Sequence, residues 1–247
     1  MPQRNTALNT AQTALARKLF ELYPTFLPTR SLYLDLEGSG RGIESIASFY
    51  WPRNSGSSRF TWAVRSPMEP LDTSDVQAAI QSLGLSGVEP RWVVVYSQGR
   101  YSADERDRVV DLLGADPWPK AEWVNLLHAF QECREMTDLI REHRHVKYFS
   151  DKTQIRRSLE SLEWEFGIIR PPSIRSHNNR YSDGQIGGMR VLDLAAKYIA
   201  GSATKTQANT LAYYCRQDVA SMQLIARACE LGIWTKQQRA VRYNRFG

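Results

Sequence analysis

Two acidic side chains interrupt an apolar run in the first quarter of the chain. Asp35 and Glu37 lie two residues apart within the sequence SLYLDLEG, which covers residues 31–38. Residues i and i+2 of a β-strand point to the same face, so both carboxylates would project to one side of a sheet. Two like charges on an otherwise buried strand need a positive partner, and oxygen ligands favour Mg²⁺ or Mn²⁺. We therefore interpret the pair as candidate metal ligands.

A second pattern lies near the other end of the chain, in the sequence YCRQDV (214–219). Tyr214 and Asp218 are four residues apart in a stretch with helical character, so both would lie on one helix face. Together with Asp35 and Glu37, they suggest metal-dependent hydrolysis of phosphodiester bonds. Each pattern alone has a simpler interpretation. An acid pair can mark a solvated strand face or a protected sheet edge, and many amphipathic helices carry a tyrosine four residues before an aspartate.

Composition places the chain among packed globular proteins. It has 247 residues, 42% of them hydrophobic, and seven tryptophans, which suits one large α/β domain rather than a disordered chain. The formal net charge of +6 favours an anionic partner such as nucleic acid without requiring one. Three cysteines without metal-ligand spacing suit a reducing compartment. With no signal peptide or membrane-spanning run, we expect a cytoplasmic protein without a membrane partner.

The elements that would position the acids can be read from hydrophobic periodicity. Strands are predicted over 31–38, 43–51 and 59–65, joined by short turns into an antiparallel meander. The continuous apolar run over 91–96 predicts a buried parallel strand. Helices are predicted over 75–83 with Ser74 as the N-cap, and over 104–113, 132–143, 151–167, 185–199 and 206–231, whereas 123–130 fits either a strand or a helix.

This order of elements matches a ribonuclease-H-like fold, an α/β fold with a mixed five-stranded sheet flanked by helices. In that fold the first strand is central and carries acids, and the last helix places another acid beside them. We accordingly divide the chain into an N-terminal helical extension (1–30), a main domain (31–231) and a basic C-terminal tail (232–247).

Over residues 31–231 the chain resembles the DEDD (DnaQ-like) exonuclease superfamily, and more narrowly the ribonuclease-H-like, YprB-like predicted 3′–5′ exonucleases. YLDLEG (33–38) is similar to the first exonuclease motif, and YCRQDV (214–219) to the third motif of the tyrosine-bearing branch. The resemblance implies that Asp35, Glu37 and Asp218 ligate two Mg²⁺ or Mn²⁺ ions and that Tyr214 orients the attacking water. It also implies single-stranded nucleic acid or 3′ ends as substrate.

The family's second motif supplies a further acid, and here three residues compete for that role. Glu105 is our first choice as the fourth metal ligand, because Glu105, Val109 and Leu112 share one helical face. Asp104 and Asp151 are the alternatives. Each of the three acids could instead simply be favoured by the dipole at a helix N-terminus.

Basic and aromatic residues offer candidate contacts to a nucleic-acid strand. Arg41 follows the acidic strand and could reach a phosphate, or could belong to an ordinary flexible turn. A basic loop and a basic tail could each guide a strand, or could simply keep the protein soluble. The loop residues are Arg170, Arg175, His177 and Arg180, and the tail residues are Lys236, Arg239, Arg242, Tyr243, Arg245 and Phe246.

Two rival functions remain open on the sequence. The first is a catalytically inactive nucleic-acid-binding or scaffolding protein on an exonuclease fold, favoured by the indistinct second motif. The second is an endonuclease of the ribonuclease H kind, which shares the carboxylate cluster. The tyrosine of YCRQDV argues against this endonuclease.

Overall fold

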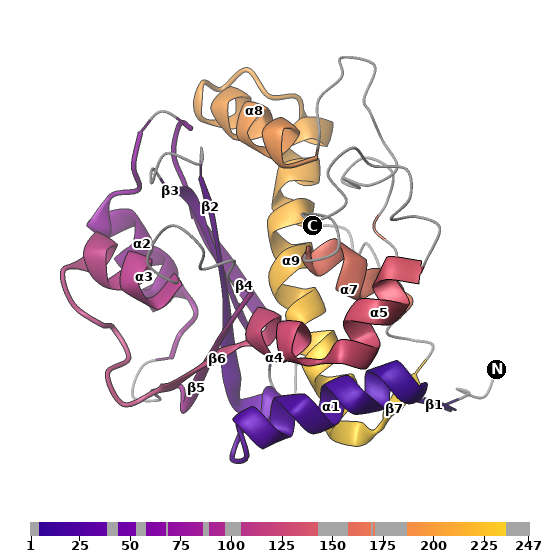
Figure 1. Cartoon of the computed structure of the whole chain (residues 1–247). Helices are drawn as coiled ribbons and strands as arrows, with labels where there is room; N and C mark the ends of the chain where they lie inside the picture. Colours follow the sequence, from indigo (N-terminus) through magenta and orange to yellow (C-terminus); the bar gives the residue numbers. More distant parts are fainter. Residues whose placement is uncertain are drawn as a thin grey trace.

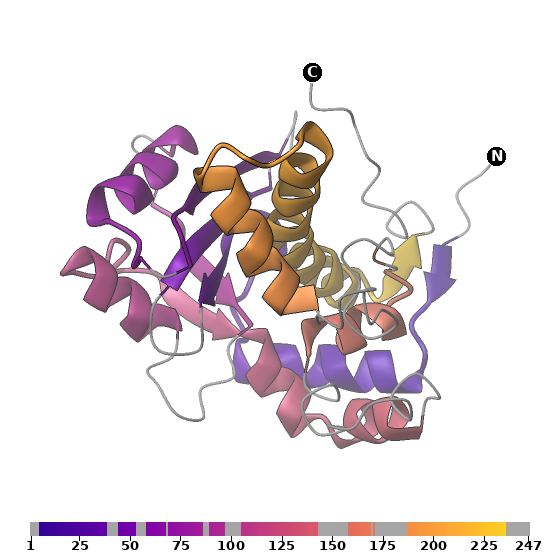
Figure 2. The same cartoon turned by 90° about the horizontal axis from the view of Figure 1, so that it is seen from above.

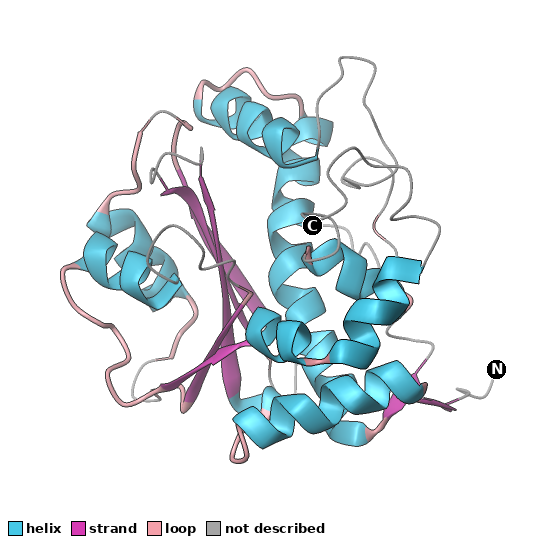
Figure 3. Cartoon of the chain, viewed as in Figure 1, coloured by secondary structure: helices cyan, strands magenta, loops and turns pink. Residues whose placement is uncertain are grey.

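The computed structural model describes residues 5–38, 44–52, 58–67, 69–85, 89–96, 105–142, 158–168, 170 and 187–235. It shows an α/β fold in which a mixed five-stranded sheet is flanked by helices (Figures 1 and 3). The α/β class and the mixed five-stranded sheet flanked by helices agree with the expectation from the sequence.

The acidic strand occupies the middle of this sheet. The strand order is β4-β3-β2-β5-β6. The bounds are Ser31–Gly38 for β2, Glu44–Trp51 for β3, Arg59–Val64 for β4, Trp92–Val95 for β5 and Glu122–Asn125 for β6. β2, β3 and β4 pair antiparallel, whereas β5 pairs parallel with both β2 and β6. The predicted meander and the predicted parallel strand are therefore both confirmed.

Helices cover both faces of the sheet, so β2 has buried residues on both of its sides. Leu32, Leu34 and Leu36 pack in a core with α2 (Thr73–Ser82) and α3 (Glu105–Leu113). Tyr33, on the opposite face, packs in the core that includes α9 (Lys205–Leu231). Figure 2 shows α2 and α3 on one side of the sheet and α9 on the other. Asp35 and Glu37 alternate with the leucines, so they face α9.

Helix α9 is defined by clear signals at both ends. Thr204 caps its N-terminus and forms a capping box with Gln207, while Gly232 ends it in the left-handed conformation with a φ of 63°. A helix of 27 residues is about 40 Å long, enough to cross the whole sheet. Tyr214 and Asp218 lie on its buried face, where both can approach β2.

Shorter helices complete the layer on the α9 side. They are α1 (Thr10–Leu22), α4 (Leu126–Glu132), α5 (Arg134–Glu142), α7 (Leu159–Glu165) and α8 (Gly187–Ile199). Leu15 and Leu19 of α1 are almost fully buried in the same core as α4, α5 and α9. The expected N-terminal extension is thus packed against the main domain.

The structure differs from the sequence prediction at four points. In the predicted helix 151–167, helix α7 begins only after its N-cap Ser158 and ends at Glu165. Asp72, not Ser74, caps α2, because its side chain accepts a hydrogen bond from the backbone N–H of Ser74. The stretch 123–130, which fitted either a strand or a helix, contains one of each: β6 ends at Asn125 and α4 starts at the next residue. The strands β1 (Asn5–Ala7) and β7 (Ile233–Thr235) pair antiparallel and were not predicted, so the expected tail begins with a paired strand.

No helix in the described part of the chain combines the length and the apolar character needed to cross a membrane.

Candidate metal centre

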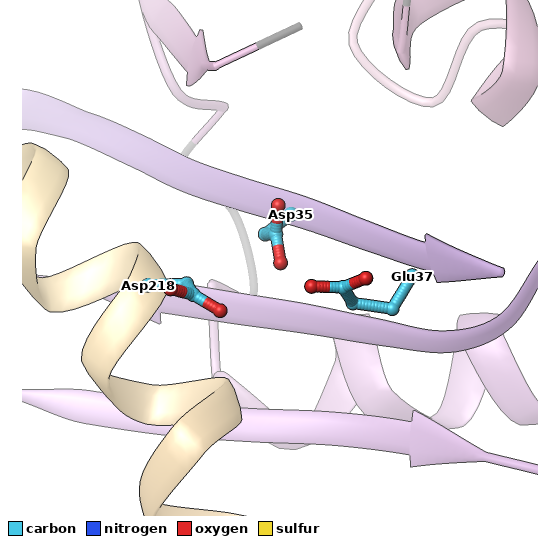
Figure 4. Close-up of side chains that lie close together, drawn as sticks. All are labelled: Asp35, Glu37 and Asp218. Carbon is cyan, nitrogen blue, oxygen red and sulfur yellow. The ribbon is translucent and has the colours of Figure 1, made fainter. Parts of the chain in front are cut away.

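Three carboxylates from two distant parts of the chain meet between the sheet and α9. Asp35 and Glu37 come from β2, and Asp218 comes from α9. One oxygen of each lies within 4.8 Å of the others, and Figure 4 shows the three side chains converging. Three of the four acids predicted as ligands are therefore brought together.

Strand pairing positions the two acids of β2. In the parallel pair, β5 is in register only with Ser31, Leu32 and Tyr33, so Asp35 and Glu37 lie beyond that pairing. On the other side, β3 stays paired with both acids, and the register shifts between Glu37 and Gly38. The two acids are thus paired with β3 on one side, whereas β5 no longer pairs with β2 at their positions.

Burial raises the pKa of all three carboxyls, and nearby acids add to each shift. Loss of solvent is the largest cause for Asp35, whose pKa is raised well above its usual value, with Glu37 and Asp218 adding to the shift. Burial and the charge of Asp218 raise the pKa of Glu37 to about 7. Burial also raises the pKa of Asp218 to about 6, although Arg170 opposes this shift. The charged forms of these groups therefore lack sufficient compensation from the protein alone.

Two of the carboxylate oxygens are buried without a hydrogen-bond partner. They are Oδ2 of Asp35 and Oδ2 of Asp218. A buried charged oxygen without a partner is costly, and a divalent cation would satisfy both. Hard oxygen donors are the ligands that such cations take. The residues present therefore fit a metal ion, and the group could hold one.

A buried arginine forms part of the same site. The guanidinium of Arg170 donates from Nε to Oε2 of Glu163 at 2.5 Å and from Nη2 to Oε1 at 2.9 Å. Nη2 also donates to Oδ1 of Asp218. Arg170 is only 4% exposed. The hypothesis that Arg170 guides a nucleic-acid strand is therefore wrong, because its side chain is turned inward and held by two acids.

Neither Arg170 nor its partner Glu163 was recognised from the sequence as part of the site. The helical spacing of Glu163 could have identified it. Glu163 lies four residues after Leu159 and three before Phe166, so it shares the apolar, inward-facing side of α7. An acid on an apolar helix face needs a cation. No sequence pattern indicates that the partner of Glu163 is Arg170.

Tyr214 lies beside the carboxylates as predicted. Its hydroxyl donates a hydrogen bond to Oε1 of Glu37 at 3.2 Å. Burial, reinforced by the charges of Asp218 and Glu37, raises the pKa of Tyr214 well above its usual value. The phenol therefore remains protonated at neutral pH and acts as a hydrogen-bond donor.

Glu105 is near the three carboxylates but is not a member of their group. It is the first residue of α3 and is 4% exposed, and its charge contributes to the raised pKa of Asp35. Nη1 of Arg108 lies 3.8 Å from Oε1 of Glu105, and Nε of Arg108 donates to Glu44 at 2.7 Å. Val109 is buried on the same side of α3, as predicted.

Several candidate residues lie outside the described part of the chain. They are Arg41, Asp104, Asp151, Arg175, His177, Arg180, Lys236, Arg239, Arg242, Tyr243, Arg245 and Phe246.

No family model, no curated protein and no solved structure matches this chain.

Proposed function

We propose that this protein is a metal-dependent 3′–5′ exonuclease that hydrolyses phosphodiester bonds of DNA or RNA on a ribonuclease-H-like fold. The observation that carries the proposal is the convergence of Asp35, Glu37 and Asp218, with one oxygen of each within 4.8 Å of the others. Tyr214 joins this group through its hydrogen bond to Glu37.

The strand order supports the ribonuclease-H-like part of the proposal. The acid-bearing β2 is central, with an antiparallel meander on one side and parallel strands on the other. Helix α9 then crosses the sheet and places Asp218 beside the strand acids. This is the arrangement expected from the order of elements in the sequence.

The three carboxylates would hold Mg²⁺ or Mn²⁺, and Glu105 is the nearby acid that could complete a two-ion site. Such ions lower the pKa of a bound water and stabilise the charge that develops on the phosphate. The raised pKa of Tyr214 keeps its phenol protonated, so it is unsuited to act as a base. Its role would be to orient the attacking water through a hydrogen bond.

The substrate class follows from charge and from the family resemblance. A formal net charge of +6 suits a polyanionic substrate. Single strands or 3′ ends, and the 3′ to 5′ direction, rest on the resemblance of YLDLEG and YCRQDV to exonuclease motifs.

The decisive experiment is degradation of 5′-labelled single-stranded DNA and RNA in Mn²⁺, Mg²⁺ or EDTA. We expect a metal-dependent ladder of shortening products that Asp35→Ala abolishes. Asp111→Ala is the matched control, because Asp111 is an exposed acid on α3. Cleavage of a circular single strand would instead indicate an endonuclease, and equal activity of Asp35→Ala and the parent would exclude the proposed site.

A catalytically inactive nucleic-acid-binding or scaffolding protein is the second candidate. The position of Glu105 outside the three-carboxylate group favours it, since a missing ligand weakens two-ion occupancy. Calorimetric titration with Mn²⁺ distinguishes the candidates. Two bound ions support the exonuclease, whereas one weakly bound ion together with retained binding of single strands supports the inactive protein.

A further inference from the structure

The inner part of the site is a chain of three charged groups from three segments. Glu163 of α7 is fully buried, Arg170 is 4% exposed and Asp218 of α9 is also 4% exposed. Removing charged side chains from water is costly, and a buried ion pair is often no more stable than apolar residues of the same size. Stability alone is therefore a weak reason for placing these charges here.

The hydrogen bonds of Arg170 fix the direction in which it meets Asp218. Nε and Nη2 take both carboxylate oxygens of Glu163, and Nη2 also donates to Oδ1 of Asp218. Because a guanidinium is planar and rigid, two bonds to Glu163 set the orientation of the whole group. Asp218 is thereby held through one oxygen, while its buried Oδ2 has no hydrogen-bond partner.

The same guanidinium also contacts the second functional residue of α9. Its central carbon lies 5.4 Å from the centre of the Tyr214 ring, within the range of a cation–π contact. Tyr214 and Asp218 are one helical turn apart, so a single side chain braces both. The pairing of Glu163 with Arg170 therefore bears on the positions of both of these side chains of α9.

We propose that Arg170, oriented by Glu163, is a positioning residue that sets the Asp218 carboxylate and the Tyr214 ring for metal binding and water orientation. This inference rests on the proposed function and deepens it. Groups that hydrogen-bond a metal ligand orient it, and their loss typically weakens metal affinity or activity about 10–100-fold. Arg170 would act through Asp218 and would not itself contact the metal or the substrate.

The opposite role for Arg170 is that of a competing cation, which would occupy the place of a metal ion on Asp218. The geometry favours positioning, because Arg170 engages Oδ1 and leaves Oδ2 available. The two roles predict opposite changes in metal affinity when Arg170 is replaced, so binding measurements separate them.

The test is calorimetric titration of Mn²⁺ into the metal-free, full-length protein and its variants Arg170→Lys, Arg170→Met and Glu163→Gln. We expect each variant to bind Mn²⁺ about 10–100-fold more weakly than the parent. Lysine keeps the charge but lacks the planar fork, so failure of Arg170→Lys to restore affinity identifies geometry as the cause. Glu163→Gln has nearly the same shape and keeps Arg170, which makes it the variant that best preserves the fold.

Two controls make the result specific. Arg227→Met removes another arginine that pairs with an acid, Glu230 of α9, and should leave Mn²⁺ affinity unchanged. Asp35→Asn should abolish binding and so locate the ion at the site. Thermal unfolding in EDTA identifies the variants that remain folded, and only those are compared.

Unchanged or tighter Mn²⁺ binding in a folded Glu163→Gln or Arg170→Met variant overturns the inference. If such a variant binds Mn²⁺ as well as the parent does, while Asp35→Asn binds none, the proposed metal site stands and only the role of Arg170 has failed. If the folded parent binds no Mn²⁺, the proposed function and this inference fail together.

Discussion

The hydroxyl of Tyr214 donates a hydrogen bond to Oε1 of Glu37 across 3.2 Å. The two residues are 177 positions apart in the chain, and this contact joins α9 to the central strand of the sheet. The bond places the phenol beside the carboxylate group, where the proposed mechanism needs a hydrogen-bond partner for the attacking water.

Tyr214→Phe should slow hydrolysis without abolishing it. The substitution keeps the ring that packs beside Arg170 and removes only the hydroxyl. We expect turnover to fall by roughly 10–100-fold, since in the proposed mechanism the residue orients water and does not carry the proton. Initial rates at saturating substrate measure this, with Mn²⁺ affinity as the control. A Tyr214→Phe enzyme as inactive as Asp35→Ala would contradict the role of an orienting group.

The sequence predicted the antiparallel meander, the parallel strand and three acids of the site, because local rules determine them. Alternation along residues 31–38 sets Asp35 and Glu37 on one face, and a four-residue spacing sets Tyr214 above Asp218. The continuous apolar run in β5 identifies a parallel strand. Each of these inferences uses residues that are neighbours in the chain.

The parts that could not be predicted depend on contacts between distant residues. Arg170 lies in a sequence rich in proline and basic residues, which by itself suggests a solvent-facing loop. Its true direction is decided by Glu163 and by Asp218, which is 48 positions away. The pairing of β1 with β7 is a similar case, because strands of three residues carry no periodicity of their own.

Leu19→Ala tests whether the N-terminal helix is a part of the main core. Leu19 is 1% exposed and packs in the cluster that includes α4, α5 and α9. We expect the free energy of unfolding to fall by about 2–5 kcal/mol, the usual cost of a large cavity. Urea unfolding measures it, with Glu21→Ala, on the exposed side of the same helix, as the control. A loss below about 0.5 kcal/mol would show that α1 is only an appended extension.

Asp35→Asn should make the metal-free protein more stable while abolishing activity. Asp35 carries a raised pKa because burial and three nearby acids oppose its charge. Because asparagine has no charge to oppose, we expect the variant to melt at a higher temperature than the parent in EDTA at neutral pH. Thermal unfolding in EDTA measures the stability, and degradation of labelled single strands in Mn²⁺ measures the activity. A variant that is less stable than the parent in EDTA would contradict the repulsion inferred here.

The stability of the metal-free protein should fall as the pH rises, whereas the stabilisation by Mn²⁺ should grow. Glu37 has a pKa of about 7 and Asp218 of about 6 in the folded protein, both above the values of 4.5 and 3.8 for unperturbed groups. Between about pH 4 and 7 the folded state therefore holds protons that the unfolded state has released, so the metal-free protein loses stability as the pH rises. Mn²⁺ binding needs the ionised carboxylates and should strengthen over the same range.

Melting temperatures from about pH 5 to about pH 7.5, in EDTA and in excess Mn²⁺, check this prediction. The melting temperature should fall with pH in EDTA, and the increase caused by Mn²⁺ should grow with pH. Glu37→Gln removes one titrating group and should flatten the curve in EDTA. Stability in EDTA that rises over this range would contradict the raised pKa values.

Glu105→Gln decides whether the acid at the start of α3 completes the site. The charge of Glu105 raises the pKa of Asp35, yet Glu105 lies outside the group formed by Asp35, Glu37 and Asp218. If Glu105 becomes a ligand when metal binds, its replacement should remove one of two Mn²⁺ ions and lower turnover at least about 100-fold. The first ion should bind with affinity within about threefold of the parent, because its three carboxylates are intact. Calorimetry gives the number of ions, and Asp111→Asn on the exposed side of α3 is the control. Two ions and full activity in Glu105→Gln would exclude Glu105 and direct attention to Asp104 and Asp151.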